Sequence, residues 1–174
     1  PYELALARPE GTQDGATRRA WVYDFGLTVP GGRDAVGKRW DAPTRERFTA
    51  AFRASYSGVT ESDAFNALVV AAGLDWREVD LLRTVGRYLR QAGLNYSQTY
   101  LAQALAANTD LARQLVRLFA LRFDPGLDLD LTTRAARTDE LVARLEGALA
   151  DVASLDHDRI VRSYLAVMNA TLRT

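Results

Sequence analysis

The chain has 174 residues, with 22 basic and 22 acidic side chains and a formal net charge of zero. That length suits one compact domain with a short appendage and is sufficient to bury a hydrophobic core. A balanced charge creates no field that would attract a nucleic acid or an anionic membrane, so we expect neither as a partner. No apolar run reaches the roughly 18 residues that a membrane span requires.

Cysteine is absent from the sequence, which excludes disulfides, thiolate metal sites and cysteine nucleophiles and fits a reducing cytoplasm. The sequence starts at Pro1 rather than at Met and shows no signal peptide, so we expect an excised piece of a cytoplasmic protein. Lys38 is the only lysine among many arginines. A GC-rich coding bias and a set of bidentate arginine contacts both explain this preference, and we favour the coding bias.

Residues 1–30 show the period of two that is typical of β-strands. Apolar side chains occupy every second position in residues 2–6 and again in residues 21–29. The link at residues 8–17 contains proline, glycine and aspartate, which suits two antiparallel strands joined as a hairpin. An isolated hairpin leaves its edges unpaired, so we expect the chain to form a homo-oligomer through it.

Residues 31–174 are predicted to form a helical domain. A glycine-rich loop at residues 30–38 is followed by the apolar period of helices along nearly all the remaining length. The fold class is therefore mainly α, with a bundle of about seven helices preceded by the N-terminal β-hairpin. The predicted helices are residues 42–56, a short helix behind Thr60, one from Asp75 to Gly93, residues 97–107, residues 108–122, one after about Thr133, and a last helix with Ile160 and Leu172 on its apolar face.

Several helix starts are marked by capping residues. Asp75 is followed three residues later by Glu78, which is a variant of the capping box. Thr60 is predicted to cap the second helix, with Asp63 in its first turn, and Ser97 to cap the fourth. Phe48, Phe52 and Tyr56 are spaced four apart, so their rings are expected to stack along the first helix.

The single histidine, His157, is the first candidate for chemistry. Asp156 and Asp158 flank it and could orient the ring or share a metal ion with it. Ser154 precedes these residues, however, and serine followed by acids is also the usual start of a helix. We favour this capping interpretation.

Three aspartates, Asp124, Asp128 and Asp130, suggest a calcium loop. Such a loop needs glycine at its sixth position and glutamate at its twelfth. Counting from Asp124 places Leu129 and Ala135 there, and counting from Asp128 places Thr133 and Asp139 there. We therefore reject a calcium site.

Nucleotide and hydrolase motifs are also missing. The sequence has no G-x-G-x-x-G turn for a dinucleotide, and Gly37-Lys38 is followed by Arg39 instead of the Ser or Thr of a phosphate loop. Ser97 and His157 could contribute to a Ser-His-acid triad, but the sequence has no G-x-S-x-G nucleophile elbow. We treat Trp21, Trp40 and Trp76 as packing residues. The sequence therefore predicts no catalytic, cofactor-binding or metal-ligating residue in this chain.

Six sequence words resemble, in order, the large bacterial NAD-specific glutamate dehydrogenases. They are FTAAF at 48–52, ESDAFNALV at 61–69, AGLDWREV at 72–79, YLRQAG at 88–93, LFALRFDP at 118–125 and SLDHDRI at 154–160. The resemblance weakens at residues 31–41 and 126–138, and Asn108-Thr109 replaces a proline that is frequent in the family. PYE at 1–3 and WVYDFGL at 21–27 resemble the end of the family's last ACT-like regulatory domain, and ATLRT at 170–174 resembles the approach to its catalytic domain. The resemblance therefore implies that residues 1–30 end an ACT-like domain and that residues 31–174 lead toward a catalytic domain absent from the sequence.

The resemblance implies an intact enzyme that oxidises L-glutamate to 2-oxoglutarate and ammonia with NAD. Enzymes of that class use lysines, an aspartate and a Rossmann domain, and none of these can be placed on this chain, in which Lys38 is the sole lysine. We therefore expect a non-catalytic connector whose partners are other domains of the same chain. The alternative is an independent helical module that binds a partner helix.

Overall fold

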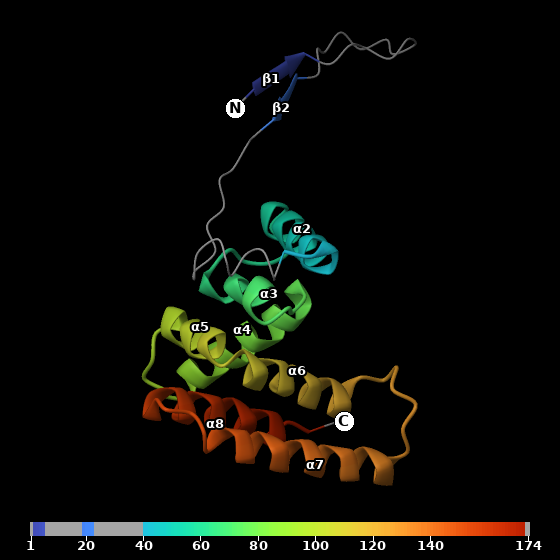
Figure 1. Cartoon of the computed structure of the whole chain (residues 1–174), viewed down its shortest axis with the longest axis vertical. Coiled ribbons are helices and arrows are strands. Elements are labelled where there is room, and N and C mark those ends of the chain that lie inside the picture. Colours follow the sequence, from blue (N-terminus) through green and yellow to red (C-terminus); the bar gives the residue numbers. More distant parts are fainter. Residues whose placement is uncertain (1, 6–18, 23–39, 173–174) are drawn as a thin grey trace. The chain divides into compact units, whose positions relative to one another are not determined.

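The computed structural model describes residues 2–5, 19–22 and 40–172 of the chain (Figure 1). These residues fall into two compact units, residues 1–38 and residues 39–174.

The described part of the first unit consists of two short strands. Strands β1 (Tyr2–Ala5) and β2 (Arg19–Val22) pair antiparallel, with Tyr2 opposite Val22 and Ala5 opposite Arg19. The second strand thus begins two residues before the predicted start at Trp21. The predicted link at residues 8–17 and the rest of the aromatic segment, residues 23–29, lie outside the described residues, so the complete hairpin stays a prediction.

The second unit is helical throughout its regular structure, as predicted. Seven α-helices, α2 to α8, and one short 3-10 helix, η1, lie within residues 40–172. Their bounds are α2 Ala42–Tyr56, η1 Ala64–Asn66, α3 Ala67–Ala71, α4 Trp76–Gln91, α5 Gln98–Ala107, α6 Thr109–Phe123, α7 Leu131–Leu149 and α8 Leu155–Ala170.

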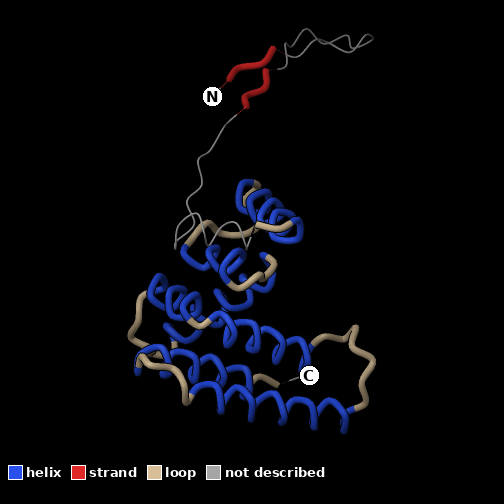
Figure 2. The backbone as a smooth tube through the Cα atoms, viewed as in Figure 1, coloured by secondary structure: helices blue, strands red, loops and turns tan. Residues whose placement is uncertain are grey.

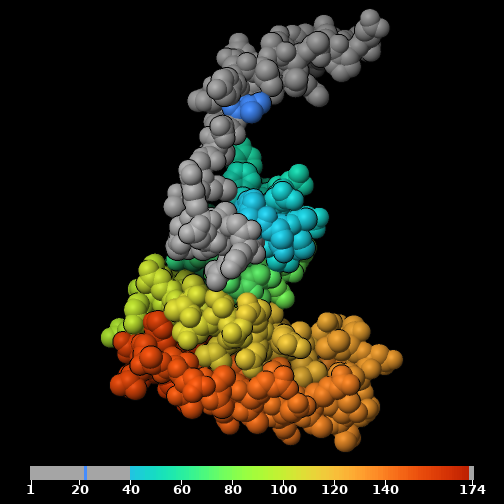
Figure 3. Space-filling view, in the orientation of Figure 1, coloured from blue at the N-terminus to red at the C-terminus, as the bar shows by residue number. Residues whose placement is uncertain are grey.

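The long C-terminal helices pack as a layer against the middle of the unit. Helices α7 and α8 run beside α5 and α6, and Figure 2 shows the wide loop that joins α6 to α7. Helix α4 contacts α5, α8 and α2, and α3 packs against α2 and α5 (Figure 1). In the space-filling view of Figure 3, α7 and α8 form a continuous band along one edge.

Apolar residues at helical spacing form the core that this packing buries. Tyr164 of α8 and Phe65 of η1 are its largest side chains, and both are fully buried. The other fully buried large residues are Leu68, Leu82, Leu101, Leu105, Leu115, Leu118, Leu145, Leu149, Ile160 and Met168. Leu172, predicted on the apolar face of the last helix, is 82% exposed because α8 ends at Ala170.

The aromatic row on α2 follows the predicted stacking. Phe48 stacks on Phe52 with ring centroids 6.5 Å apart, and Phe52 stacks on Tyr56 at 6.2 Å. Trp40 adds an edge contact to Phe48 at 5.3 Å, so it is a packing residue as predicted. The row becomes steadily more exposed toward Tyr56, which is 84% exposed.

Two predicted helix starts are wrong. Thr60 does not cap the second helix, because its hydroxyl bonds to Asp80, and Asp63 caps η1 by accepting from the Phe65 amide at 2.9 Å. The sixth helix starts at Leu131 rather than after Thr133, because the Asp130 carboxylate accepts from the Thr133 amide at 2.9 Å. In both places an aspartate supplies the cap.

The capping box of α4 is confirmed and predicts a loss of stability when it is broken. Asp75 accepts from the amides of Arg77 and Glu78 at 2.8 and 2.9 Å, and Glu78 accepts from the Asp75 amide at 2.8 Å. We expect Asp75→Ala to lower the free energy of unfolding by about 0.5–2 kcal/mol in urea denaturation. Glu46→Ala, an exposed acid within α2, is the control and should change it by less than about 0.5 kcal/mol. Equal losses for the two variants would contradict this prediction.

Candidate functional site

The histidine candidate lies at the start of α8, where the capping interpretation is confirmed. Ser154 caps the helix by accepting from the His157 amide at 3.4 Å. The side-chain amide nitrogen of Asn108 lies 3.2 Å from Nδ1 of His157 and also donates to the Ala104 carbonyl. Because an amide nitrogen only donates, Nδ1 accepts and the ring proton is assigned to Nε2. Half-buried His157 thus joins α8 to the turn between α5 and α6.

The two acids that flank His157 bond to other groups. Tyr96 donates to Asp156 at 2.7 Å, and this hydrogen bond raises the pKa of Tyr96 above its usual value. Asp158 accepts from Arg162 at 2.9 Å, one turn further along α8. Within the described residues, no group of three histidines or acids could hold a metal ion.

The aspartates of the rejected calcium loop shape the connection between α6 and α7. Asp124 accepts from the Gly126 amide at 2.8 Å. Asp130 accepts from the Thr133 hydroxyl at 2.6 Å, and its hydrogen bonds with Thr133 lower the pKa of Asp130. The carboxylates therefore serve a turn and a helix cap.

The remaining candidates have structural roles where the structure describes them. Ser97 caps α5 by accepting from the Tyr100 amide at 3.1 Å. The guanidinium carbon of Arg77 lies 4.2 Å above the centre of the Trp76 ring. Lys38 and the side chain of Trp21 lie outside the described part of the chain.

A buried cluster around Arg83 of α4 is a feature that sequence reasoning missed. Arg83 is 3% exposed and donates to both oxygens of Asp63 at 2.9 Å. It also pairs with Asp80 and donates to the side-chain amide oxygen of Asn66 at 2.5 Å and to the Thr60 hydroxyl at 3.2 Å. These bonds fasten η1 and the loop before it to α4.

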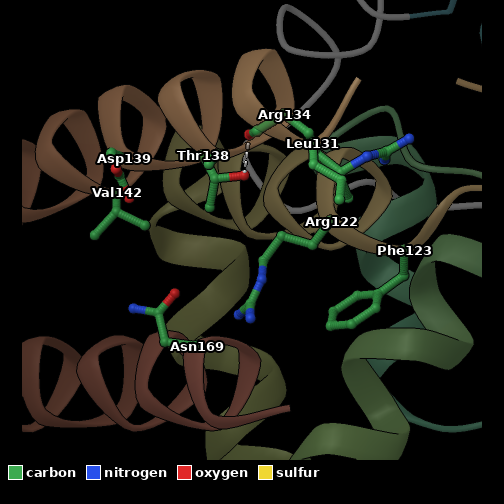
Figure 4. A pocket seen from close by; sticks show the side chains of 9 residues that line it. Arg122, Phe123, Leu131, Arg134, Thr138, Asp139, Val142 and Asn169 are labelled. Carbon is green, nitrogen blue, oxygen red and sulfur yellow. Dashed lines mark hydrogen bonds between the residues drawn. The ribbon is translucent and has the colours of Figure 1, made fainter. Parts of the chain in front are cut away.

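A second missed feature is a pocket of about 460 Å³ at the end of the unit where α6, α7 and α8 meet (Figure 4). Its polar part comes from arginine, threonine, aspartate and asparagine, and its apolar part from phenylalanine, leucine, valine and alanine. The lining residues are Arg122, Phe123, Leu131, Arg134, Ala135, Thr138, Asp139, Val142 and Asn169.

The two arginines of the pocket cap helix C-termini. Arg122 donates to the carbonyls of Met168 and Thr171 at the end of α8, the second at 3.1 Å. Arg134 donates to Leu121 at the end of α6 at 2.6 Å and to Leu127 in the following loop at 2.8 Å. Cations at helix C-termini are stabilised by the helix dipole. These bonds hold α6, α7 and α8 together at this end.

The described helices thus form a packed helical bundle. Its polar side chains mainly cap helices or connect one helix to another. The family model "Glutamate dehydrogenase, helical motif 3" matches residues 60–125, which run from the turn before η1 to just past α6. None of the described helices is long and apolar enough to cross a membrane.

Similar proteins extend this match to most of the chain. Three proteins are each named "NAD-specific glutamate dehydrogenase": that of Pseudomonas aeruginosa is 42% identical over 90% of this chain, that of Halomonas elongata 37% over 88%, and that of Mycobacterium tuberculosis 37% over 98%. The chain spans 9–10% of the length of these relatives. Over most of its length the chain is therefore similar to one segment of these NAD-specific glutamate dehydrogenases, and the predicted resemblance is confirmed.

Proposed function

We propose that this chain is a non-catalytic helical connector within an NAD-dependent glutamate dehydrogenase. The intact enzyme would convert L-glutamate, NAD and water to 2-oxoglutarate, ammonia and NADH in the cytoplasm. The names of the relatives support this activity for a longer protein, of which this chain matches about a tenth. The observation that carries the proposal is the agreement between the matched helical motif, residues 60–125, and a packed block of helices joined by the Arg83 cluster.

That agreement has a physical basis in the contacts of residues 60–125. The segment contains Leu101 and Leu115 of the buried core and the complete Arg83 cluster. A close-packed interior has low compressibility, so a block of this kind resists bending. It also passes a displacement at one end on to the other end. We infer that the block holds other domains of the same chain in a fixed relation, including an ACT-like regulatory domain that ends in residues 1–30.

The proposal predicts that the isolated 174-residue chain neither oxidises glutamate nor binds NAD. Titration calorimetry of the chain with NAD should show no saturable heat at micromolar concentrations, because no glycine-rich turn offers backbone amides to a pyrophosphate. The intact parent enzyme, titrated in the same buffer, is the positive control. Saturable binding to the isolated chain would place part of the cofactor site here and overturn the connector role.

The alternative, an independent interaction module, draws support from exposed apolar side chains. Tyr56, Val59 and Tyr88 are 84%, 63% and 56% exposed. In a connector these side chains would contact another domain of the same chain, whereas in a module they would receive a partner helix. The reading frame of the gene decides between the two: continuation beyond Thr174 into a lysine-bearing dehydrogenase sequence supports the connector, and a stop codon supports the module.

We propose further that the isolated chain forms a homo-oligomer through residues 1–30. The pairing of β1 and β2 supports this, because a two-stranded sheet has an unpaired edge on each strand. Deletion of residues 1–30 should convert a dimer into a soluble monomer in light scattering. A full-length chain that is already monomeric, or a deletion variant that remains dimeric, would rule out association through this segment.

A further inference from the structure

Arg134 differs in one respect from the other buried arginine of the described residues. Arg83 is 3% exposed and pairs with the carboxylates of Asp63 and Asp80. Arg134 is 8% exposed, but it donates only to backbone carbonyls, and its Nε is buried without a partner. A helix C-terminus offsets about half a unit charge. Part of the positive charge of Arg134 is therefore left without compensation.

Arg122 adds a second guanidinium to the same pocket with the same kind of partners. It is half-buried, and its bonds go to carbonyls at the end of α8. It is not among the arginines that form ion pairs within residues 40–172. In Figure 4 its guanidinium extends toward the side of the pocket from which Asn169 projects. Two arginines and one acid, Asp139, thus line the pocket, and in Figure 4 the Arg134 side chain extends away from the guanidinium of Arg122.

The remaining lining residues define what kind of molecule could balance this charge. Phe123, Leu131 and Val142 supply apolar surface, and Thr138 and Asn169 supply hydrogen-bonding groups. Guanidinium groups bind carboxylates with paired, charge-assisted hydrogen bonds. The volume of about 460 Å³ falls within the range of small-molecule pockets.

We propose that this pocket binds a small organic monocarboxylate, with its carboxylate at Arg122 and its apolar body against Phe123, Leu131 and Val142. A single negative charge fits best because Asp139, on the rim, repels a second one. The carboxylate supplies the countercharge that Arg122 lacks within the described residues. Because Arg122 holds the end of α8, an occupied pocket also strengthens the contact between α6 and α8. The proposal does not depend on the connector role.

The test uses hexanoate as the probe and the full 174-residue chain labelled with ¹⁵N. At constant ionic strength, hexanoate should shift the side-chain Nε–H signal of Arg122 saturably, with a Kd on the order of 1 mM. Two comparison ligands keep the same carbon chain: 1-hexanol lacks the charge, and adipate carries two charges. Both should bind at least about tenfold more weakly than hexanoate.

Matched variants separate the pocket from nonspecific binding. Ala135→Phe fills the pocket from an exposed position, and Ala136→Phe, on the same helix but outside the lining, is its control. Arg122→Gln removes the proposed carboxylate partner, and Arg117→Gln, exposed on the same helix, is its control. For Arg122→Gln and Arg117→Gln, binding is followed on backbone amide signals. Ala135→Phe and Arg122→Gln should each weaken binding at least about tenfold, while the controls bind as the parent does.

Several results would overturn the proposal. Absence of a saturable shift up to the solubility limit of hexanoate would do so, as would equal or tighter binding of 1-hexanol or adipate. Because Arg122→Gln removes a helix cap, circular dichroism must first show that it folds. Ala135→Phe keeps both arginines and therefore their helix caps. If this variant folds and still binds hexanoate as the parent does, that result is sufficient to refute the site.

Discussion

Gly86→Val should lower the free energy of unfolding by about 3 kcal/mol in urea denaturation, because a side chain at this position of α4 would collide with Tyr164 of α8. A Cβ atom at Gly86 would lie 2.5 Å from the Tyr164 hydroxyl and 3.2 Å from Cζ of Phe65. Tyr164 and Phe65 are both fully buried, so neither ring has free space to move into. Valine would add two further methyl groups to this contact.

Two smaller changes, Tyr164→Phe and Gly86→Ala, test whether the Tyr164 hydroxyl causes this loss of stability. The Tyr164 hydroxyl is buried without a hydrogen-bond partner, and burial raises the pKa of Tyr164 far above its usual value. Tyr164→Phe alone should therefore be neutral or stabilise by up to about 1 kcal/mol. Gly86→Ala should cost about 1–2 kcal/mol beside Tyr164 and close to nothing combined with Tyr164→Phe.

The control for Gly86→Val is Gly147→Val in α7, where a Cβ would meet nothing within 4 Å. Valine has a higher helix propensity than glycine, so this variant should be neutral or slightly more stable. Equal losses at Gly86 and Gly147 would show that a general effect of valine, rather than the contact with Tyr164, causes the destabilisation.

The helix starts could be predicted from the sequence where the signal is local. Asp75 with Glu78, Ser97 and Ser154 each cap a helix whose first residues lie within three positions, so the pattern alone indicates the bond. The same method failed at Thr60, because its hydroxyl bonds to Asp80, twenty residues away. A local pattern cannot show that a distant group competes for a capping residue.

The sequence did not identify the two buried arginines of the bundle, because their partners also lie in other segments of the chain. Arg83 and Arg134 were counted only as part of an arginine-rich composition, yet both are buried and join separate segments. Gly147 is also an isolated glycine inside a helix, and a Cβ there would meet nothing within 4 Å, so the sequence alone did not mark the close contact at Gly86. The helix that packs against it could not be read from the sequence.

Arg83→Met is expected to cost about 3 kcal/mol of unfolding free energy, because it leaves two aspartates without their buried cation. Asp63 and Asp80 have side chains only 23% and 33% exposed, so water compensates them incompletely. Methionine keeps the apolar length of the side chain, so most of the loss comes from the charge and its hydrogen bonds.

The matched control is Arg87→Met, one turn further along α4. Arg87 pairs with Glu61, and their side chains are 50% and 52% exposed, so water replaces most of this interaction. We expect a loss below about 1 kcal/mol for Arg87→Met in the same urea titration. Adding Asp80→Asn to Arg83→Met should recover part of the loss, because a neutral amide costs less to leave unpaired than a carboxylate. If Arg83→Met and Arg87→Met cost the same, the cluster does not fasten η1 to α4, and the rigid block at residues 60–125 loses its main polar support.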